Sequence, residues 1–193
     1  MTFSWMRAAM VILGTCVGTC VAAPALHAQT VELGAQATYL DLAVLEQSGW
    51  GVGGRFGWEA LPFVTLEAEV NAFPGSDGAG GPFVQGLGGV KLGGRGRGYG
   101  LFAKLRPGFV RFDRDFIQPG TACIAIFPTP RECLANQLNL ALDVGSVVEV
   151  YPTQRLTIRV DIGTTHVWYG SQGDTPTRRY GNFQLGVGAG VRF

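Results

Sequence analysis

Apolar and polar residues alternate along the last stretch of the chain, residues 183–193. A period of two residues is typical of a β-strand whose two faces meet different surroundings. A strand of a transmembrane barrel turns its apolar face to lipid and its polar face to the lumen, which is the pattern here. The apolar face carries Phe183, Leu185, Val187, Ala189, Val191 and Phe193, and the opposite face carries Gln184, Gly186, Gly188, Gly190 and Arg192.

Seven segments upstream repeat this alternation, most clearly residues 63–73, where Val64, Leu66 and Val70 oppose Glu67 and Glu69. No stretch after residue 28 shows a helical period. We therefore predict an all-β fold, an eight-stranded antiparallel up-and-down transmembrane β-barrel. The predicted strands cover residues 30–41, 50–59, 63–73, 83–93, 99–112, 138–150, 155–166 and 180–193.

The connections between these strands alternate in length. Those after the second, fourth and sixth strands are short, whereas those after the third, fifth and seventh are longer, above all residues 113–137. An even number of strands puts both termini on one side, which in outer-membrane barrels is the periplasm. Short periplasmic turns and long outer loops are typical of this class.

Aromatic residues gather near the predicted strand ends, where rings favour the membrane interface. An ordinary aromatic core of a soluble β-domain is the alternative interpretation. The predicted periplasmic girdle contains Trp58, Phe63, Tyr99, Tyr151 and Phe193, and the outer girdle contains Tyr39, Trp50, Phe73, Trp168, Tyr169 and Tyr180.

Residues 1–28 have the features of a secretory signal peptide. Arg7 is followed by an apolar run and then by small residues. We expect cleavage after Ala28, with Ala25 as the alternative, so that the barrel domain covers residues 29–193. A membrane anchor is less consistent with this segment, because its apolar core is shorter than the ~20 residues of a spanning helix.

A lipoprotein signal that ends at Cys16 or Cys20 is a second alternative for the leader. The residue before each of these cysteines is Thr, which fits a lipid-attachment sequence poorly. We therefore favour simple cleavage and a chain without a lipid anchor.

The charge balance excludes a general attraction to nucleic acids. Loss of Arg7 with the leader leaves 14 Lys+Arg against 14 Asp+Glu, so the mature chain is formally neutral. The 30 glycines of 193 residues agree with strands that need close backbone approach.

Charged residues of both signs fall on the predicted lumen face, where they nearly cancel. The interior of an eight-stranded barrel is only wide enough for side chains to fill it, so these charges must pair. We predict a salt-bridge network centred on Glu67, Glu69, Lys104, Arg106, Arg159 and Asp161. Such a network either fills and fixes the barrel or forms a gated ion path of low conductance. The wider inward set adds Glu32, Arg55, Glu59, Lys91, Asp143, Glu149 and Arg192.

Cys123 and Cys133 are the only cysteines after the leader, and both lie in the longest loop. A pair of cysteines in an exported protein predicts a disulfide, which here would close an excursion over residues 127–130. Two free or metal-bound thiols are the alternative, and the absence of nearby histidines argues against a metal. This loop is the best candidate for contact with a partner.

No catalytic constellation is evident, and we expect neither an enzyme nor a cofactor. His166 is the only histidine after the leader, and it lacks the serine that nucleophilic catalysis would require nearby. The glycine-rich residues 94–98 lack the Gly-Lys-Ser/Thr ending of a phosphate-binding loop.

The leader, the eight alternating segments and three short sequences resemble the OmpA/OmpX-type small outer-membrane β-barrel family over the whole mature chain. These sequences are residues 104–109 (KLRPGF), 159–163 (RVDIG) and 190–193 (GVRF). The resemblance implies a monomer among the lipids of the outer membrane of a Gram-negative-type bacterium. It also implies that the barrel-assembly machinery reads the final strand, whose matching residues are Val187, Ala189, Val191 and Phe193.

The resemblance leaves the activity open, because this family includes adhesins, structural anchors, narrow channels and lipid-modifying enzymes. We expect a role in envelope integrity or surface adhesion through the outer loops, with an extracellular ligand as a candidate partner. The alternative is a narrow or gated porin-like channel through the charged lumen.

Overall fold

The computed structural model describes residues 30–76, 78–123, 130, 133–173 and 175–193. The predicted signal peptide, both cleavage positions, Cys16 and Cys20 lie outside these residues. So do residues 127–129 of the excursion between the two loop cysteines.

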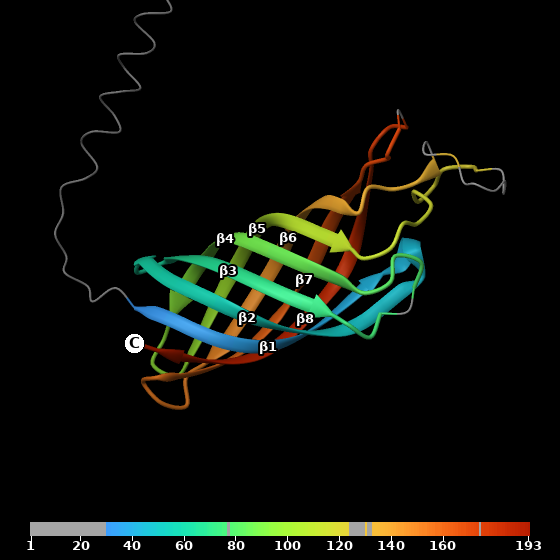
Figure 1. The fold of residues 1–193 in the computed structure, drawn as a ribbon. Coiled ribbons are helices and arrows are strands. Elements are labelled where there is room, and N and C mark those ends of the chain that lie inside the picture. The colour runs from blue at the N-terminus through green and yellow to red at the C-terminus, as the bar shows by residue number, and fades with distance from the viewer. Residues whose placement is uncertain (1–29, 77, 124–129, 131–132, 174) are drawn as a thin grey trace, which may run out of the picture.

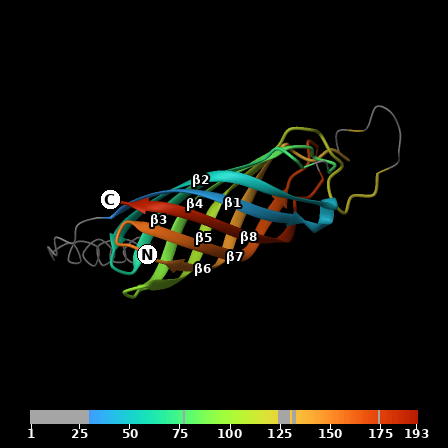
Figure 2. The same ribbon diagram turned by 90° about the horizontal axis from the view of Figure 1, so that it is seen from below.

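Eight antiparallel strands form one closed barrel in which each strand pairs with its sequence neighbours and β8 pairs with β1 (Figures 1 and 2). The predicted fold class is therefore confirmed. Among the described residues, no helix is long and apolar enough to cross a membrane. The strands are β1 (Val31–Leu42), β2 (Gln47–Leu61), β3 (Val64–Phe73), β4 (Phe83–Arg95), β5 (Tyr99–Phe112), β6 (Leu138–Val150), β7 (Leu156–Tyr169) and β8 (Arg178–Arg192).

Strands β5 and β6 begin and end at the predicted residues, but several others extend further toward the outer end. The largest difference is at the first connection, which was expected to cover residues 42–49. There β1 and β2 continue as a ladder as far as the pair Leu42 and Gln47, and only a short 3-10 turn, Ala43–Leu45, joins them. Glu46 closes this turn in the left-handed conformation, with φ 51°.

Both ends of the described barrel lie at the same rim (Figure 1). The backbone N–H of Val31 donates to the carbonyl of Phe193 at 3.3 Å, and the N–H of Phe193 donates to the carbonyl of Val31 at 2.9 Å. This rim is the periplasmic end expected of the fold, and the rim with the long connections is the outer end.

The barrel exterior is apolar, as a lipid-facing surface must be. Leu66, Val160 and Val187 expose 39%, 42% and 45% of their surface, whereas the strand neighbours Glu67 and Arg159 point inward and are buried. The alternation in the sequence therefore corresponds to an apolar outside and a charged inside.

The aromatic girdles are correct only in part. Trp50, Phe63, Tyr99 and Phe193 are exposed on the outside, as predicted. In contrast, Phe73 and Tyr169 point inward and are buried, because their strand positions share the parity of the lumen residues. The prediction placed them by their closeness to strand ends and neglected that parity.

Candidate functional site in the barrel lumen

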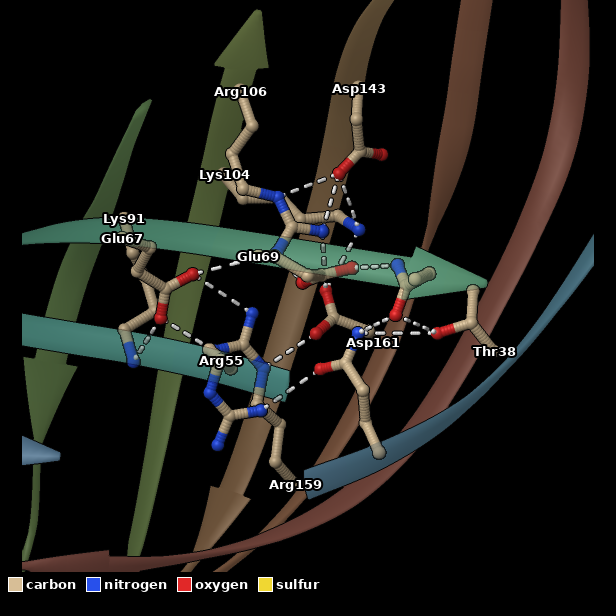
Figure 3. Close-up of polar contacts among 12 residues, drawn as sticks. Thr38, Arg55, Glu67, Glu69, Lys91, Lys104, Arg106, Asp143, Arg159 and Asp161 are labelled. Carbon is tan, nitrogen blue, oxygen red and sulfur yellow. Dashed lines mark hydrogen bonds and ion pairs between the residues drawn. The ribbon is translucent and has the colours of Figure 1, made fainter. Parts of the chain in front are cut away.

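Strands β3, β5 and β7 bring the six predicted network residues together inside the barrel (Figure 3). Each of these strands contributes two charged residues spaced two apart, so that both side chains of a pair enter the lumen. The residues are Glu67 and Glu69 on β3, Lys104 and Arg106 on β5, and Arg159 and Asp161 on β7, and each is at most 5% exposed.

Arg159 links β7 to the opposite wall of the barrel. Its Nη1 and Nη2 donate to Glu67 Oε1 and Oε2 at 2.5 and 3.0 Å, which is a two-point contact. Its Nε donates to Asp161 Oδ2 at 2.5 Å. Because β3 and β7 are four strands apart in a ring of eight, the Glu67–Arg159 pair spans the width of the lumen.

Arg106 forms the second centre of the network. Its Nη1 donates to Glu69 Oε2 at 2.5 Å, and its Nε and Nη2 donate to Asp143 Oδ2 at 2.8 and 2.5 Å. Lys104 Nζ lies 2.9 Å from Asp143 Oδ2 and 2.8 Å from Asp161 Oδ1. The Arg106 contacts are charge-assisted hydrogen bonds, which are the strong ones, whereas Lys104 Nζ contributes by ion-pair distance alone.

Lys91, Asp143 and Glu149 belong to the same network, although the sequence prediction did not place them at its centre. Lys91 Nζ lies 3.1 Å from Glu67 Oε1 and also pairs with Glu149. Every acid in the network therefore has a cationic partner, as burial in a narrow lumen requires. With its charges neutralised in this way, the cluster has the character of a filled core and offers no free acid or base.

Two further ion pairs lie toward the periplasmic end. Arg55 Nη2 donates to Glu32 Oε1 at 2.6 Å, and Arg95 pairs with Glu59. The phenol of Tyr151, just beyond β6, donates to Glu149 Oε2 at 2.7 Å. Burial raises the pKa of Tyr151, and its hydrogen bond to Glu149 raises it further, so this group stays neutral.

A layer of uncharged polar side chains covers the network on its outer side. Asn71 Nδ2 donates to Glu69 Oε1 at 2.6 Å and to Gln85 Oε1 at 3.1 Å. Gln85 Nε2 and Thr165 Oγ1 then donate to Gln184 Oε1 at 3.0 and 2.6 Å. Hydrogen bonds therefore cross the barrel in this layer too.

An apolar plug fills the lumen beyond this polar layer, and it was not expected from the sequence. The rings of Phe73 and Phe83 stack at 4.3 Å between centroids, and Phe116 packs edge-on against Phe112 at 4.8 Å. The buried members of the plug are Leu40, Leu42, Phe73, Phe83, Leu87, Val110, Phe112, Phe116, Ala135, Ala141, Val167 and Tyr169.

A signal for this plug exists in the sequence. At the outer ends of β3, β5 and β7 the alternation gives way to consecutive apolar residues, as in Ala72 and Phe73 or Val167, Trp168 and Tyr169. Where apolar residues occupy both faces of a strand end, both faces are expected to lie in an apolar environment.

The long connection after β5 folds back over the plug. Phe116 is part of the plug, and Gln118, which is fully buried, donates from Nε2 to the carbonyls of Tyr169 and Pro176 at 2.8 and 3.1 Å. Bridges between Ile117 and Leu134 and between Ala135 and Ser171 tie this connection to itself and to the β7–β8 connection. The predicted disulfide is present, with the Cα atoms of Cys123 and Cys133 6.0 Å apart.

His166 lies on the lipid-facing side of β7 and is partly buried. Its ring is 6.5 Å from that of Trp168, and its Nδ1 has no hydrogen-bond partner among the described residues. Within the same residues, no group of three or more His, Cys, Asp or Glu side chains is arranged to hold a metal ion.

Val187, Ala189, Val191 and Phe193, the residues expected to form the assembly signal, all point outward. Val187 and Val191 are each 45% exposed, and Phe193 is 74% exposed at the rim. They therefore form one continuous apolar stripe along β8.

Three solved structures illustrate what the fold resembles. The N-terminal β-barrel domain of Pseudomonas aeruginosa OprF superposes with a TM-score of 0.54 at 15% identity, covering 85% of this chain and 97% of that one. Neisserial surface protein A gives a TM-score of 0.48 at 12% identity and covers 85% and 95%. Ail, the attachment invasion locus protein of Yersinia pestis, gives 0.48 at 14% identity and covers 86% and 97%.

No family model matches the chain, and no curated protein matches it. The OprF likeness confirms the predicted fold, a closed eight-stranded up-and-down β-barrel. With its apolar exterior, this fold is that of a barrel that crosses a membrane.

Proposed function

We propose that this protein is a non-conducting barrel whose role is carried by its outer surface, in envelope integrity or in surface adhesion. The observation that carries the proposal is the filling of the lumen by three successive layers of side chains. The charged network occupies the centre, the uncharged polar layer covers it, and the apolar plug occupies the outer end.

The charged network opposes a water-filled path. Arg106, Asp143 and Arg159 are at most 1% exposed, and each contacts partners from other strands. An ion passing this level would have to displace an ion pair such as Glu67–Arg159. Removal of one partner from a buried ion pair costs about 3–5 kcal/mol, so such openings would be rare.

The apolar plug is a second barrier in series with the first. Phe112 is in ring contact with Phe83, Phe116 and Tyr169, so that the outer opening is closed by aromatic packing. A hydrophobic constriction excludes water and ions even when the charged level below it fluctuates.

The described part of the β5–β6 connection supplies a fixed surface for contact. Gln118 anchors the β5–β6 connection, the disulfide closes part of it, and Ile117 beside this anchor is 52% exposed. Function on a rigid barrel is concentrated in such loops. We infer that an extracellular ligand contacts this connection.

The lateral position of His166 supports a non-enzymatic role. Its ring lies on the outer, lipid-facing surface of β7 beside Trp168 and does not point into the lumen. A hydrolase on this scaffold would need a serine and an acid within hydrogen-bond reach of the imidazole.

Single-channel recording of the refolded protein in planar bilayers tests the proposal. The wild type, Glu67→Gln and Arg106→Gln are compared at the same protein density. We expect no stable conductance from the wild type. An open state of defined size that changes when Glu67 or Arg106 is neutralised would instead establish the porin-like alternative.

The surface role is tested by photo-crosslinking on whole cells. A crosslinking amino acid in place of Ile117 should capture a protein partner at the outer surface, whereas the same residue in place of Arg97, at the periplasmic turn, should capture no such protein. Equal capture at both positions would contradict a role of the outer connections.

A further inference from the structure

A basic hollow of about 520 Å³ lies at the periplasmic end of the barrel. The β4–β5 turn, the β6–β7 turn and the end of β8 enclose it, and two backbone hydrogen bonds fix these segments. The N–H of Tyr151 donates to the carbonyl of Gly98 at 2.9 Å, and the N–H of Arg192 donates to the carbonyl of Arg155 at 2.7 Å. The hollow is therefore part of the rigid rim.

Arginines surround this hollow with too few carboxylates to balance them. Arg95 pairs with Glu59 and also contacts Glu149. Within the described residues, no carboxylate lies at ion-pair distance from Arg97 or Arg192, which line the hollow, or from Arg155 beside it. Three guanidinium groups without an ion-pair partner, two on turns and one at the end of β8, attract an anion.

Arg192 is held in place without an acidic partner. Its guanidinium carbon lies 5.0 Å from the centre of the Tyr151 ring, and that of Arg95 lies 5.9 Å from the same ring. The Nε of Arg192 is buried and has no hydrogen-bond partner among the described residues. Because Tyr151 stays neutral, it does not cancel the positive charge of Arg192, and the Nε–H of Arg192 is left without an acceptor in the described part of the chain.

A second hollow, of about 480 Å³, adjoins the first and leads onto the lipid-facing wall. Both share Gln154 and Arg192, and the second adds Arg155, Val191 and Phe193. From Val191 an apolar groove continues along the seam where β8 pairs with β1. The small residues Ala35 and Ala189 line it together with the larger Leu33, Leu156 and Val191.

We propose that this continuous surface binds one anionic phospholipid of the periplasmic leaflet. The phosphate lies between Arg155 and Arg192, and one acyl chain lies in the groove over Ala35 and Ala189. Lipid phosphate is recognised by basic pockets at the membrane surface, and an acyl chain requires an adjoining apolar path. Free phosphate would bind the same arginines, but it has no acyl chain to occupy the groove.

Native mass spectrometry of the folded protein in detergent tests the assignment. The probes are phosphatidylglycerol, zwitterionic phosphatidylethanolamine and soluble glycerol 3-phosphate. We expect the wild type to retain phosphatidylglycerol over phosphatidylethanolamine by roughly tenfold. Arg155→Gln combined with Arg192→Gln should abolish this preference, whereas Arg111→Gln with Arg179→Gln, which removes two exposed cations from the outer half, should keep it.

The groove is tested separately by Ala35→Phe, which places a large ring among its lining residues and leaves every arginine in place. Phosphatidylglycerol retention should fall severalfold. Equal retention of both lipids, retention unaffected by the Arg155 and Arg192 changes, or equally effective competition by glycerol 3-phosphate would each overturn the proposal. Heat-modifiable gel mobility verifies that each variant is folded. The result is independent of conductance and of the outer loops.

Discussion

Glu67 and Arg159 face each other from opposite walls of the barrel and meet in a two-point contact at 2.5 and 3.0 Å. Their strands, β3 and β7, share no ladder. The pair therefore links two parts of the wall that backbone hydrogen bonds do not join directly. It makes the ionic network a structural element of the barrel.

Neutralising one member of this pair should destabilise the barrel. Glu67→Gln leaves Arg159 and Lys91 with less negative charge in a buried site, and we expect a loss of about 3 kcal/mol or more in the free energy of unfolding. Urea unfolding in lipid vesicles measures it. Arg159→Met should cost a similar amount, and the double variant should cost clearly less than the sum. Additive losses would contradict direct pairing.

Aromatic packing in the apolar plug should contribute strongly to stability. Phe112→Ala removes a buried ring from contact with Phe83, Phe116 and Tyr169, so we expect a loss of about 3–5 kcal/mol on urea unfolding. Phe112→Leu keeps most of the volume and should lose less. Bilayer conductance should remain absent in both, since the charged network still blocks the lumen; a permanent pore in Phe112→Ala would show that the plug is the only barrier.

Gly108 should not tolerate a side chain. A Cβ at this position would lie 1.9 Å from the carbonyl oxygen of Gly86 on the neighbouring strand, and backbone cannot move aside cheaply. We expect Gly108→Ala to lose about 1–3 kcal/mol or to refold in low yield. Gly88→Ala is the matched control, because its Cβ would meet nothing closer than 3.8 Å. Equal refolding yields for the two would contradict the close approach of β4 and β5.

The terminal aromatic residue should matter for assembly in the cell more than for the folded state. Phe193 is 74% exposed, so Phe193→Ala should leave refolding in vesicles nearly unchanged and should lower the amount in the outer membrane severalfold. Tyr99→Ala, a change of a ring 68% exposed at the same rim, is the control. Equal amounts of the two variants in cell envelopes would contradict a role of Phe193 in assembly.

The disulfide should protect the outer connection from proteolysis without holding the barrel together. Replacing Cys123 and Cys133 by Ser should speed cleavage in the β5–β6 connection several-fold, because the cross-link no longer restricts local opening. The barrel fragments should stay associated, since β5 and β6 are joined by their ladder. Limited proteolysis of intact cells with mass mapping follows both effects, and reduction of the wild type should reproduce them.

The sequence predicts the strands and their faces well, because successive side chains of each strand point alternately to the lipid and to the lumen. Leu105 and Arg106 illustrate this, since their opposite chemistry leaves one orientation in a membrane. The charged residues of the centre could be named for the same reason. Their partners could not, because alternation fixes the face of a residue but not its height relative to distant strands. The contact between Glu67 and Arg159 depends on the tilt and stagger of the closed barrel.

The apolar plug was missed for a different physical reason. Alternation predicts that an inward residue is polar, yet Phe73 and Val110 point inward and are apolar. They are stable there because side chains from several strands and Phe116 of a long connection close the outer end together. A sequence pattern confined to one strand does not contain that convergence.

The most direct test of a filled lumen is a solid-state NMR measurement of the contact between the Arg159 guanidinium nitrogens and the Glu67 carboxyl carbon in lipid bilayers. Selective ¹⁵N and ¹³C labels are used, with Glu67→Gln to assign the signal. We expect strong dipolar coupling between the two groups, as a direct ion pair across the lumen requires. Absence of coupling, with the Arg159 guanidinium accessible to water, would show that the lumen is open and would contradict a filled, non-conducting barrel.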